Sequence, residues 1–130
     1  EDIRTVLDWH AARMEYDEAV QRVHARWDER NPHHWCHTNS NAQIVAIGLL
    51  WGENDFGTSI CRSVQPCFDC DCNGATVGSI YGMMHGANAL PATWTRPLND
   101  QLETGLTGYR QSQISALASQ TCALINTMAV

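Results

Sequence analysis

Residues 69–89 read DCDCNGATVGSIYGMMHGANA, in which glycine recurs at every fourth position from Gly74 to Gly86. This spacing places the four glycines on one stripe of a helix that we expect over about residues 74–89. Each glycine costs roughly 1 kcal/mol relative to alanine in a helix interior. We therefore expect another backbone to pack very closely against this glycine stripe.

The rest of the chain shows apolar residues at helical spacing, and no segment shows the alternation that is typical of a strand. We expect N-caps at Asp17, at Ser40 or Asn39, and at Asp55. The helices that we expect cover about residues 2–14, 17–27, 40–51 and 55–64, and a last one starts at residue 112. In the last helix the residues expected to face inward are Ile114, Leu117, Ala118, Cys122, Leu124 and Ile125.

One segment, from Ile44 to Trp51, is apolar nearly all round, which is typical of a helix at the centre of a fold. A chain of 130 residues is long enough to bury a core of its own. We find no linker, low-complexity tract or convincing repeat. The sequence therefore predicts a single all-α domain over residues 1–130.

The charge balance excludes some classes of partner. The formal net charge is −6, and all eight basic residues are arginines, which argues against duplex nucleic-acid binding. The start of the chain lacks a basic region followed by an apolar run, so we expect no signal peptide. No apolar stretch has the length that a membrane span needs. We read the six cysteines as mostly free thiols and expect a reducing, cytoplasmic location.

Asp69 and Asp71 are the only charged residues between Arg62 and Arg96. Carboxylates in such surroundings are costly to desolvate unless a positive charge neutralises them. A bound cation is the leading explanation, and an arginine from elsewhere in the fold is the rival. Oxygen ligands in a loop favour a hard ion such as Mg²⁺ or Ca²⁺. A purely structural role, in which one acid caps the following helix, stays open.

Other groups of possible ligands lie nearby in the sequence. Cys67, Cys70 and Cys72, with Cys61 or His37, offer a zinc arrangement, although buried thiols are the simpler interpretation because no second pair of ligands follows. His33, His34 and His37 are either metal ligands or surface residues. His37 and Thr38 are the better candidates for a polar pocket wall, because they come directly before a buried helix.

Two segments become recognisable in combination. Residues 68–80 read FDCDCNGATVGSI, and Gly86, Ala89-Leu90-Pro91 and Trp94 follow them. Residues 34–42 read HWCHTNSNA. Together they resemble the C-terminal part of the ADP-ribosylglycohydrolase family, which has a similar H-W-x-H-T-x-x-N-A segment. Residues 2–4 and 97–100 are also similar, so the resemblance spans nearly the whole chain.

The resemblance implies an orthogonal helical bundle, like the C-terminal half of that family's fold. It implies hydrolysis of the bond between ADP-ribose and an acceptor, with a pair of Mg²⁺ ions, or Mn²⁺ in some members. By motif, the implied metal ligands are Asp69, Asp71 and Cys72. The implied substrate-binding residues are His37, Thr38, Asn41 and Asn73, and no catalytic residue is assigned.

This chain departs from the family in two respects. Cys70 and Cys72 stand where the family usually or often has threonine, and Pro66-Cys67 stands where small glycines are usual. In addition, family members are substantially longer, and an early acidic motif supplies further metal ligands. Nothing in this sequence matches that motif.

We therefore interpret the chain as a truncated relative that self-associates as a homo-oligomer and is weakly active or inactive by itself. An active hydrolase, as a fragment or with ligands recruited across a dimer, is the second hypothesis. A module that binds ADP-ribose or a nucleotide without turnover is the third, and a purely structural helical protein is the last. The expected partners are ADP-ribose or an ADP-ribosylated substrate, with no duplex nucleic acid and no membrane.

Overall fold

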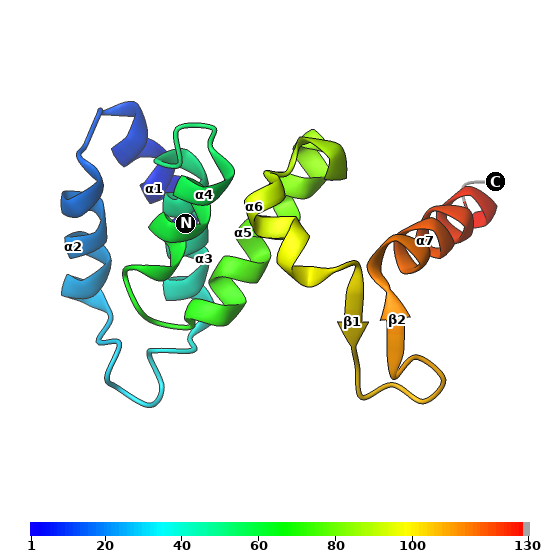
Figure 1. Ribbon diagram of the computed structural model, residues 1–130. Coiled ribbons are helices and arrows are strands. Elements are labelled where there is room, and N and C mark those ends of the chain that lie inside the picture. Colours follow the sequence, from blue (N-terminus) through cyan, green and yellow to red (C-terminus); the bar gives the residue numbers. More distant parts are fainter. Residues whose placement is uncertain (129–130) are drawn as a thin grey trace. The chain divides into compact units, whose positions relative to one another are not determined.

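The computed structural model describes residues 1–128, which form seven α-helices, two short 3₁₀ helices and one β-hairpin (Figure 1). The predicted all-α fold is confirmed. The chain divides into two compact units, Glu1–Ala89 and the part from Leu90 onward. The single domain expected over residues 1–130 stays a prediction.

The first unit contains five α-helices, and most of its helix–helix contacts are made by the third. Helix α3 packs against each of the other four, and α4 also packs against α5. The elements of the first unit are α1 (Asp2–Ala11), α2 (Tyr16–Arg26), α3 (Thr38–Leu50), α4 (Phe56–Val64), α5 (Cys70–His85) and the 3₁₀ helix η1 (Ala87–Ala89).

Helix α3 is central because it has no charged residue and buries side chains on several sides. The core cluster that forms around it draws on α1, α2, α3 and the loop before α5. Its members are Val6, Ala19, Val23, Ile44, Ile47 and Phe68. At the end of α3 the Trp51 indole N–H donates to the Met14 carbonyl at 2.9 Å, which ties α3 to the α1–α2 loop.

A close approach between two helices does occur in this unit, but it lies between α3 and α4. A Cβ placed on Gly48 would lie 2.7 Å from the Ser63 Cβ and 3.0 Å from the Ser59 carbonyl oxygen. Both serines are buried. Glycine at position 48 therefore lets the α4 backbone approach α3.

The prediction for the glycine stripe of α5 is wrong. A Cβ on Gly74 would lie 3.1 Å from the Val64 side chain, and one on Gly78 would lie 3.8 Å from that of Ile60. Gly82 has no such atom within 4 Å, and Gly86 lies beyond the helix with φ +80°. Side chains of α4, rather than a backbone, therefore cover the stripe, and they cover only its first half.

Several predicted helix boundaries differ from the structure. Helix α1 ends at Ala11 rather than near Met14, because Arg13 adopts a left-handed conformation with φ 58°. Helix α5 covers Cys70–His85 rather than residues 74–89, because the i→i−4 bonding begins at the Asp69 carbonyl and the helix stops before Gly86.

Of the predicted N-caps, only Asp55 is confirmed, and its carboxylate accepts from the Thr58 N–H at 2.7 Å. Helix α2 begins one residue before Asp17, after Glu15. Helix α3 is capped by His37 rather than by Ser40 or Asn39, because the imidazole Nδ1 accepts from the Asn39 N–H at 3.1 Å.

The second unit contains the short α6 (Ala92–Thr95), the 3₁₀ helix η2 (Arg96–Leu98), a hairpin and α7 (Ile114–Met128). The hairpin strands β1 (Gln101–Glu103) and β2 (Gln111–Gln113) pair antiparallel, with Gln101 opposite Gln113. The sequence pattern did not predict these strands, because three residues are too few to show alternation. The Asp100 carboxylate lies at the first turn of α7, where it accepts from the N–H and the hydroxyl of Ser115.

Helix α7 differs from its prediction, because it has no buried residue. Leu124 is 63% exposed and Ile125 is 59% exposed, so the expected inward face is not buried. None of the described helices has both the length and the apolar character that crossing a bilayer requires.

The Asp55 cap predicts a pH-dependent contribution to stability. The Thr58 N–H that donates to the carboxylate holds the pKa of Asp55 below its usual value. The stabilisation is therefore present above the unfolded-state pKa and is lost as pH falls through the folded-state pKa, below about pH 4. Asp55→Ala should lower the urea midpoint at neutral pH, and the difference from wild type should shrink in acid.

Asp55→Asn is the matched control, because asparagine caps a helix about as well and does not ionise. Its urea midpoint at neutral pH should stay near that of the wild type. An Asp55→Ala variant as stable as Asp55→Asn at neutral pH would contradict the role of this cap.

Candidate metal centre

Three side chains at the start of α5 form the candidate site. The possible ligand atoms of Asp69, Asp71 and Cys72 all lie within 4.8 Å of one another. Asp69 is partly buried, whereas Asp71 and Cys72 are exposed. Asp69 occupies the N-cap position of α5 without a side-chain capping bond. Its carboxylate therefore does not cap the helix.

No arginine neutralises these carboxylates within the described residues. The ion pairs found there join Arg22 to Glu18, His24 to Glu29, Arg26 to Asp2 and Arg30 to Glu29. The rival explanation, an arginine from elsewhere in the fold, thus receives no support from residues 1–128.

The two acids and the thiol influence one another's protonation. The pKa of Asp71 is lowered, chiefly because the Asp69 side chain hydrogen-bonds to it and then because backbone N–H groups donate to it. The pKa of Cys72 is raised, chiefly because its thiol hydrogen-bonds to Asp69 and next because the negative charge of Asp69 disfavours a thiolate. The site therefore presents an ionised Asp71 beside a protonated thiol.

This donor set fits a hard divalent cation through its oxygens. Carboxylates suit Mg²⁺ and Mn²⁺, whereas thiolate ligands select softer metals. Asp69 and Asp71 would therefore hold the ion, and Cys72 as a protonated thiol suits a hydrogen bond to Asp69 better than ligation. Cys72 as a metal ligand stays a prediction.

The backbone immediately before Asp69 is unusual. Cys67 and Phe68 both adopt left-handed conformations, with φ 66° and 63°. A bulky residue rarely adopts this region, so the surroundings must hold it there. The Phe68 side chain is 7% exposed and belongs to the core cluster. Its burial anchors the loop that carries Asp69.

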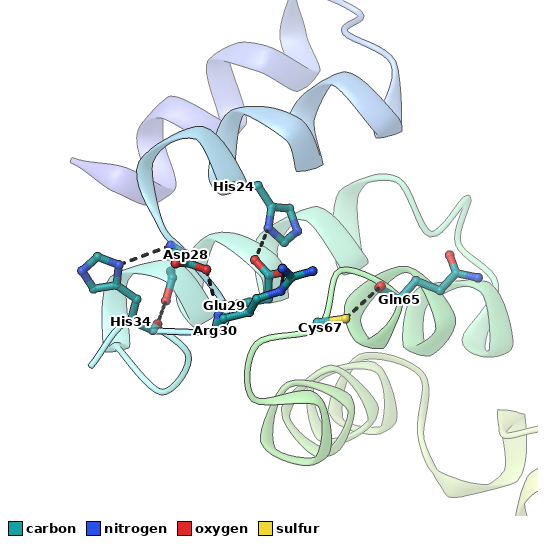
Figure 2. A network of polar contacts seen from close by, with 8 residues as sticks. His24, Asp28, Glu29, Arg30, His34, Gln65 and Cys67 are labelled. Carbon is teal, nitrogen blue, oxygen red and sulfur yellow. Dashed lines mark hydrogen bonds and ion pairs between the residues drawn. The ribbon is translucent and has the colours of Figure 1, made fainter. Parts of the chain in front are cut away.

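The neighbours of Phe68 include a polar network between α2 and the following loop (Figure 2). The His24 ring lies 4.9 Å from the Phe68 ring, and its Nδ1 lies 3.0 Å from the Glu29 carboxylate. Figure 2 shows His24 directed at Glu29, and it shows Cys67 on the loop between α4 and α5. Helix α2 therefore supports the anchor of the Asp69 loop.

Asn41 joins the two segments that the sequence singled out. Its Oδ1 accepts from the Asp69 N–H at 3.1 Å and from the Asn73 Nδ2 at 2.8 Å. Its Nδ2 donates to the carbonyl oxygens of Trp35 at 2.9 Å and His37 at 3.0 Å. One amide at the start of α3 thus fixes the backbone of Asp69 and the side chain of Asn73.

The predicted substrate-binding residues fall into two places. Asn41 and Asn73 lie beside the acidic cluster, but the contacts described above are all within the protein, and Asn73 is only 2% exposed. His37 uses Nδ1 to cap α3, and its ring stacks on Trp27 with centroids 4.5 Å apart. Contact of any of these residues with a substrate stays a prediction.

Thr38, like the His37 side chain, has no contact with the acids among those described. It lines a depression formed by the chain start, α2 and α3, to which neither Asp69 nor Asp71 contributes. The other lining residues are Glu1, Asp2, Ile3, Arg26, Asn39 and Ala42.

The alternative metal sites are not assembled. Within residues 1–128, the only group of three or more histidine, cysteine or acidic side chains close enough for one ion is Asp69, Asp71 and Cys72. The zinc arrangement of Cys67, Cys70 and Cys72 with Cys61 or His37 therefore does not form, and the three histidines do not converge. All six cysteines are free.

A family model described as ADP-ribosylglycohydrolase matches residues 1–128. No match was found among curated proteins or among solved structures.

The bridging contacts of Asn41 predict a local effect at the candidate site. Asn41→Ala removes the acceptor for the Asp69 N–H, so amide hydrogen exchange at Asp69 should accelerate, as measured by NMR. The free energy of unfolding should fall by about 1–2 kcal/mol, because two partly buried and two exposed hydrogen bonds are lost.

Trp51→Phe is the control, because it removes one hydrogen bond at the opposite end of α3. It should destabilise the fold without accelerating exchange at Asp69 through local opening. Equal acceleration in both variants would show that Asn41 has no specific hold on Asp69.

Proposed function

The chain belongs to the ADP-ribosylglycohydrolase family, and we propose that Asp69 and Asp71 are one set of ligands in a Mg²⁺-dependent site that hydrolyses an ADP-ribosyl linkage. The observation that carries the proposal is the convergence of these carboxylates, without a basic partner in the described residues, at the family's late acidic motif. Mn²⁺ is the alternative ion, since it takes the same oxygen ligands.

Each residue of the site has a distinct task in this proposal. When bound, the metal would orient the ribose hydroxyls and activate a water. Asp69 and Asp71 bind the ion. Asn41 holds the backbone of Asp69, and Cys72 hydrogen-bonds to the Asp69 carboxylate.

We further propose that residues 1–128 supply only part of the full site. A two-metal centre needs carboxylates from several elements, and a single acidic cluster forms among the described residues. A second set of ligands would come from further chain or from a second copy. Residues 1–130 are then weakly active or inactive by themselves.

Metal binding is the direct test. Titration calorimetry with MgCl₂ and with MnCl₂ should show saturable binding, and Asp71→Asn should weaken it by about tenfold or more because a charged ligand is lost. Asp8→Asn is the charge-matched control, since Asp8 is an exposed residue of α1 and lies outside the cluster. Equal affinities in wild type and Asp71→Asn would contradict the metal site.

Turnover is measured separately. With Mg²⁺ and an ADP-ribosylated peptide, the chain should release little or no ADP-ribose, and addition of a polypeptide that carries an early acidic motif should raise the rate. Binding of free ADP-ribose without turnover under both conditions would instead favour a non-catalytic binding module.

Self-association is a second candidate function, and one feature of α5 favours it. Met83 is 88% exposed and Met84 is 68% exposed, and both line an open apolar depression with Ser79 and Ile80. Such an apolar surface on a helix end is typical of a contact site.

If a second copy covers this surface, sedimentation velocity should show a dimer, and Met84→Glu should shift the chain to monomer. Leu106→Glu, at another exposed apolar residue, should leave the dimer intact. A wild-type chain that is monomeric at high concentration would contradict this function.

A further inference from the structure

We propose that Cys67 and Cys70 form a reversible disulfide that reshapes the loop carrying Asp69. The two cysteines have C-x-x-C spacing across the junction between α4 and α5. They stand where the family resemblance predicts glycine and threonine, so the pair is a feature of this chain rather than of its family.

The backbone brings the pair together. Four fully extended residues would separate the outer Cα atoms by roughly 10 Å, whereas a disulfide needs less than about 7 Å. Here Cys67 and Phe68 have consecutive positive φ values, and the Cys70 N–H donates to the Phe68 carbonyl at 3.1 Å. The segment from Cys67 to Cys70 is therefore tightly bent.

Both cysteines also bind the same atom. The Val64 carbonyl oxygen at the end of α4 accepts from the Cys67 N–H at 3.1 Å and from the Cys70 thiol at 3.3 Å. The Cys67 thiol lies 3.9 Å from the neighbouring Gln65 carbonyl (Figure 2). One oxygen thus lies within 3.3 Å of both the Cys67 nitrogen and the Cys70 sulfur, and we infer that rotation of the side chains can bring the two sulfurs together.

The exposure of the two thiols indicates which of them reacts first. Cys67 is exposed and Cys70 is partly buried. The Cys67 sulfur attacks one sulfur of a low-molecular-weight disulfide, releases the first small thiol and forms a mixed disulfide. The Cys70 sulfur then attacks the Cys67 sulfur and releases the second small thiol. The protein loses two electrons and two protons, and one small disulfide becomes two thiols.

Closure of this ring acts on the candidate site. Asp69 lies inside the ring, between the two cysteines, and Cys70 is the first residue of α5. Oxidation removes the bond from the Cys70 thiol to Val64 and pulls Cys70 toward Cys67. Asp69 then shifts relative to Asp71, so the oxidised form binds Mg²⁺ more weakly; this last step rests on the proposed function.

Oxidised glutathione is the probe for the modification. The native chain, treated and then mapped by mass spectrometry after digestion, should lose the mass of two hydrogen atoms, with the bond assigned to Cys67 and Cys70. Reduction should restore the original mass. Absence of an internal disulfide, or its assignment to another pair such as Cys67 and Cys72, would overturn the proposal.

Single cysteine-to-serine variants distinguish loss of the disulfide from loss of the fold. Cys70→Ser should accumulate a stable glutathione adduct at Cys67, because the resolving thiol is lost, and Cys67→Ser should form no internal disulfide. Cys61→Ser is the control, since it removes another exposed cysteine and should leave the disulfide intact. Loss of the disulfide in Cys61→Ser, with helical circular dichroism unchanged, would also overturn the assignment.

Calorimetry then compares the reduced and oxidised chains. Oxidation should weaken Mg²⁺ binding by about tenfold or more, in the range expected when the support of a metal ligand is disturbed. Equal affinity in the two states would refute control of the loop. If the disulfide forms but the reduced chain binds no Mg²⁺, the metal site fails while the disulfide stands.

Discussion

The burial of α3 is the constraint on which the first unit depends. This helix has no charged residue, and from Ile44 to Leu50 it has no polar side chain, so no polar face is available to remain in water there. Four helices must therefore surround it, and they do so with a core in which Ile44 and Ile47 are fully buried. The start of α3 cannot be enclosed in the same way, because its first N–H groups need polar partners. The His37 cap and the Asn41 bridge lie there, so the candidate site forms where the buried helix begins.

Much of this arrangement follows from the sequence, and the exceptions share a physical origin. The helices, the central position of α3 and the Asp55 cap depend on local periodicity and local hydrogen bonding, which a sequence shows directly. The pairing of Asp69 with Asp71 was also predictable, because only one residue separates them in the sequence. Asn41 contacts Asp69, which is 28 positions away in the sequence, and Asn73, which is 32 positions away. No spacing rule predicts contacts over such separations. The prediction from the glycine stripe of α5 was wrong, because the four-residue spacing indicates a close contact on that face but does not indicate whether a backbone or side chains make it.

The electrostatics of the site depend on the lack of basic partners for Asp69 and Asp71 among the described residues. Three other acids of the unit, Glu18, Asp2 and Glu29, form ion pairs with arginine or histidine. Among residues 1–128, the groups that influence the pKa values of Asp71 and Cys72 are the two carboxylates and backbone N–H groups, and no arginine or histidine forms an ion pair with Asp69 or Asp71. Two neighbouring carboxylates without a cation repel when both are ionised, and a shared hydrogen bond relieves that repulsion only while one stays protonated. A divalent ion relieves it without a proton, which is why the same geometry favours metal binding near neutral pH.

Phe68 shows how the core and the site constrain each other. The left-handed backbone conformation of Phe68 costs free energy that a glycine would not pay. The family resemblance leads us to expect glycines at the two preceding positions, where this chain has Pro66 and Cys67. The cost is offset by burying the Phe68 ring in the core cluster, which also contains Val23 and Ile44. The ring also lies beside that of His24. A glycine loop would reach the same shape without an anchor. The aromatic residue instead anchors the loop in the core at Phe68. A covalent bond between Cys67 and Cys70 therefore has to be accommodated by Asp69 and the first residues of α5 rather than by Phe68.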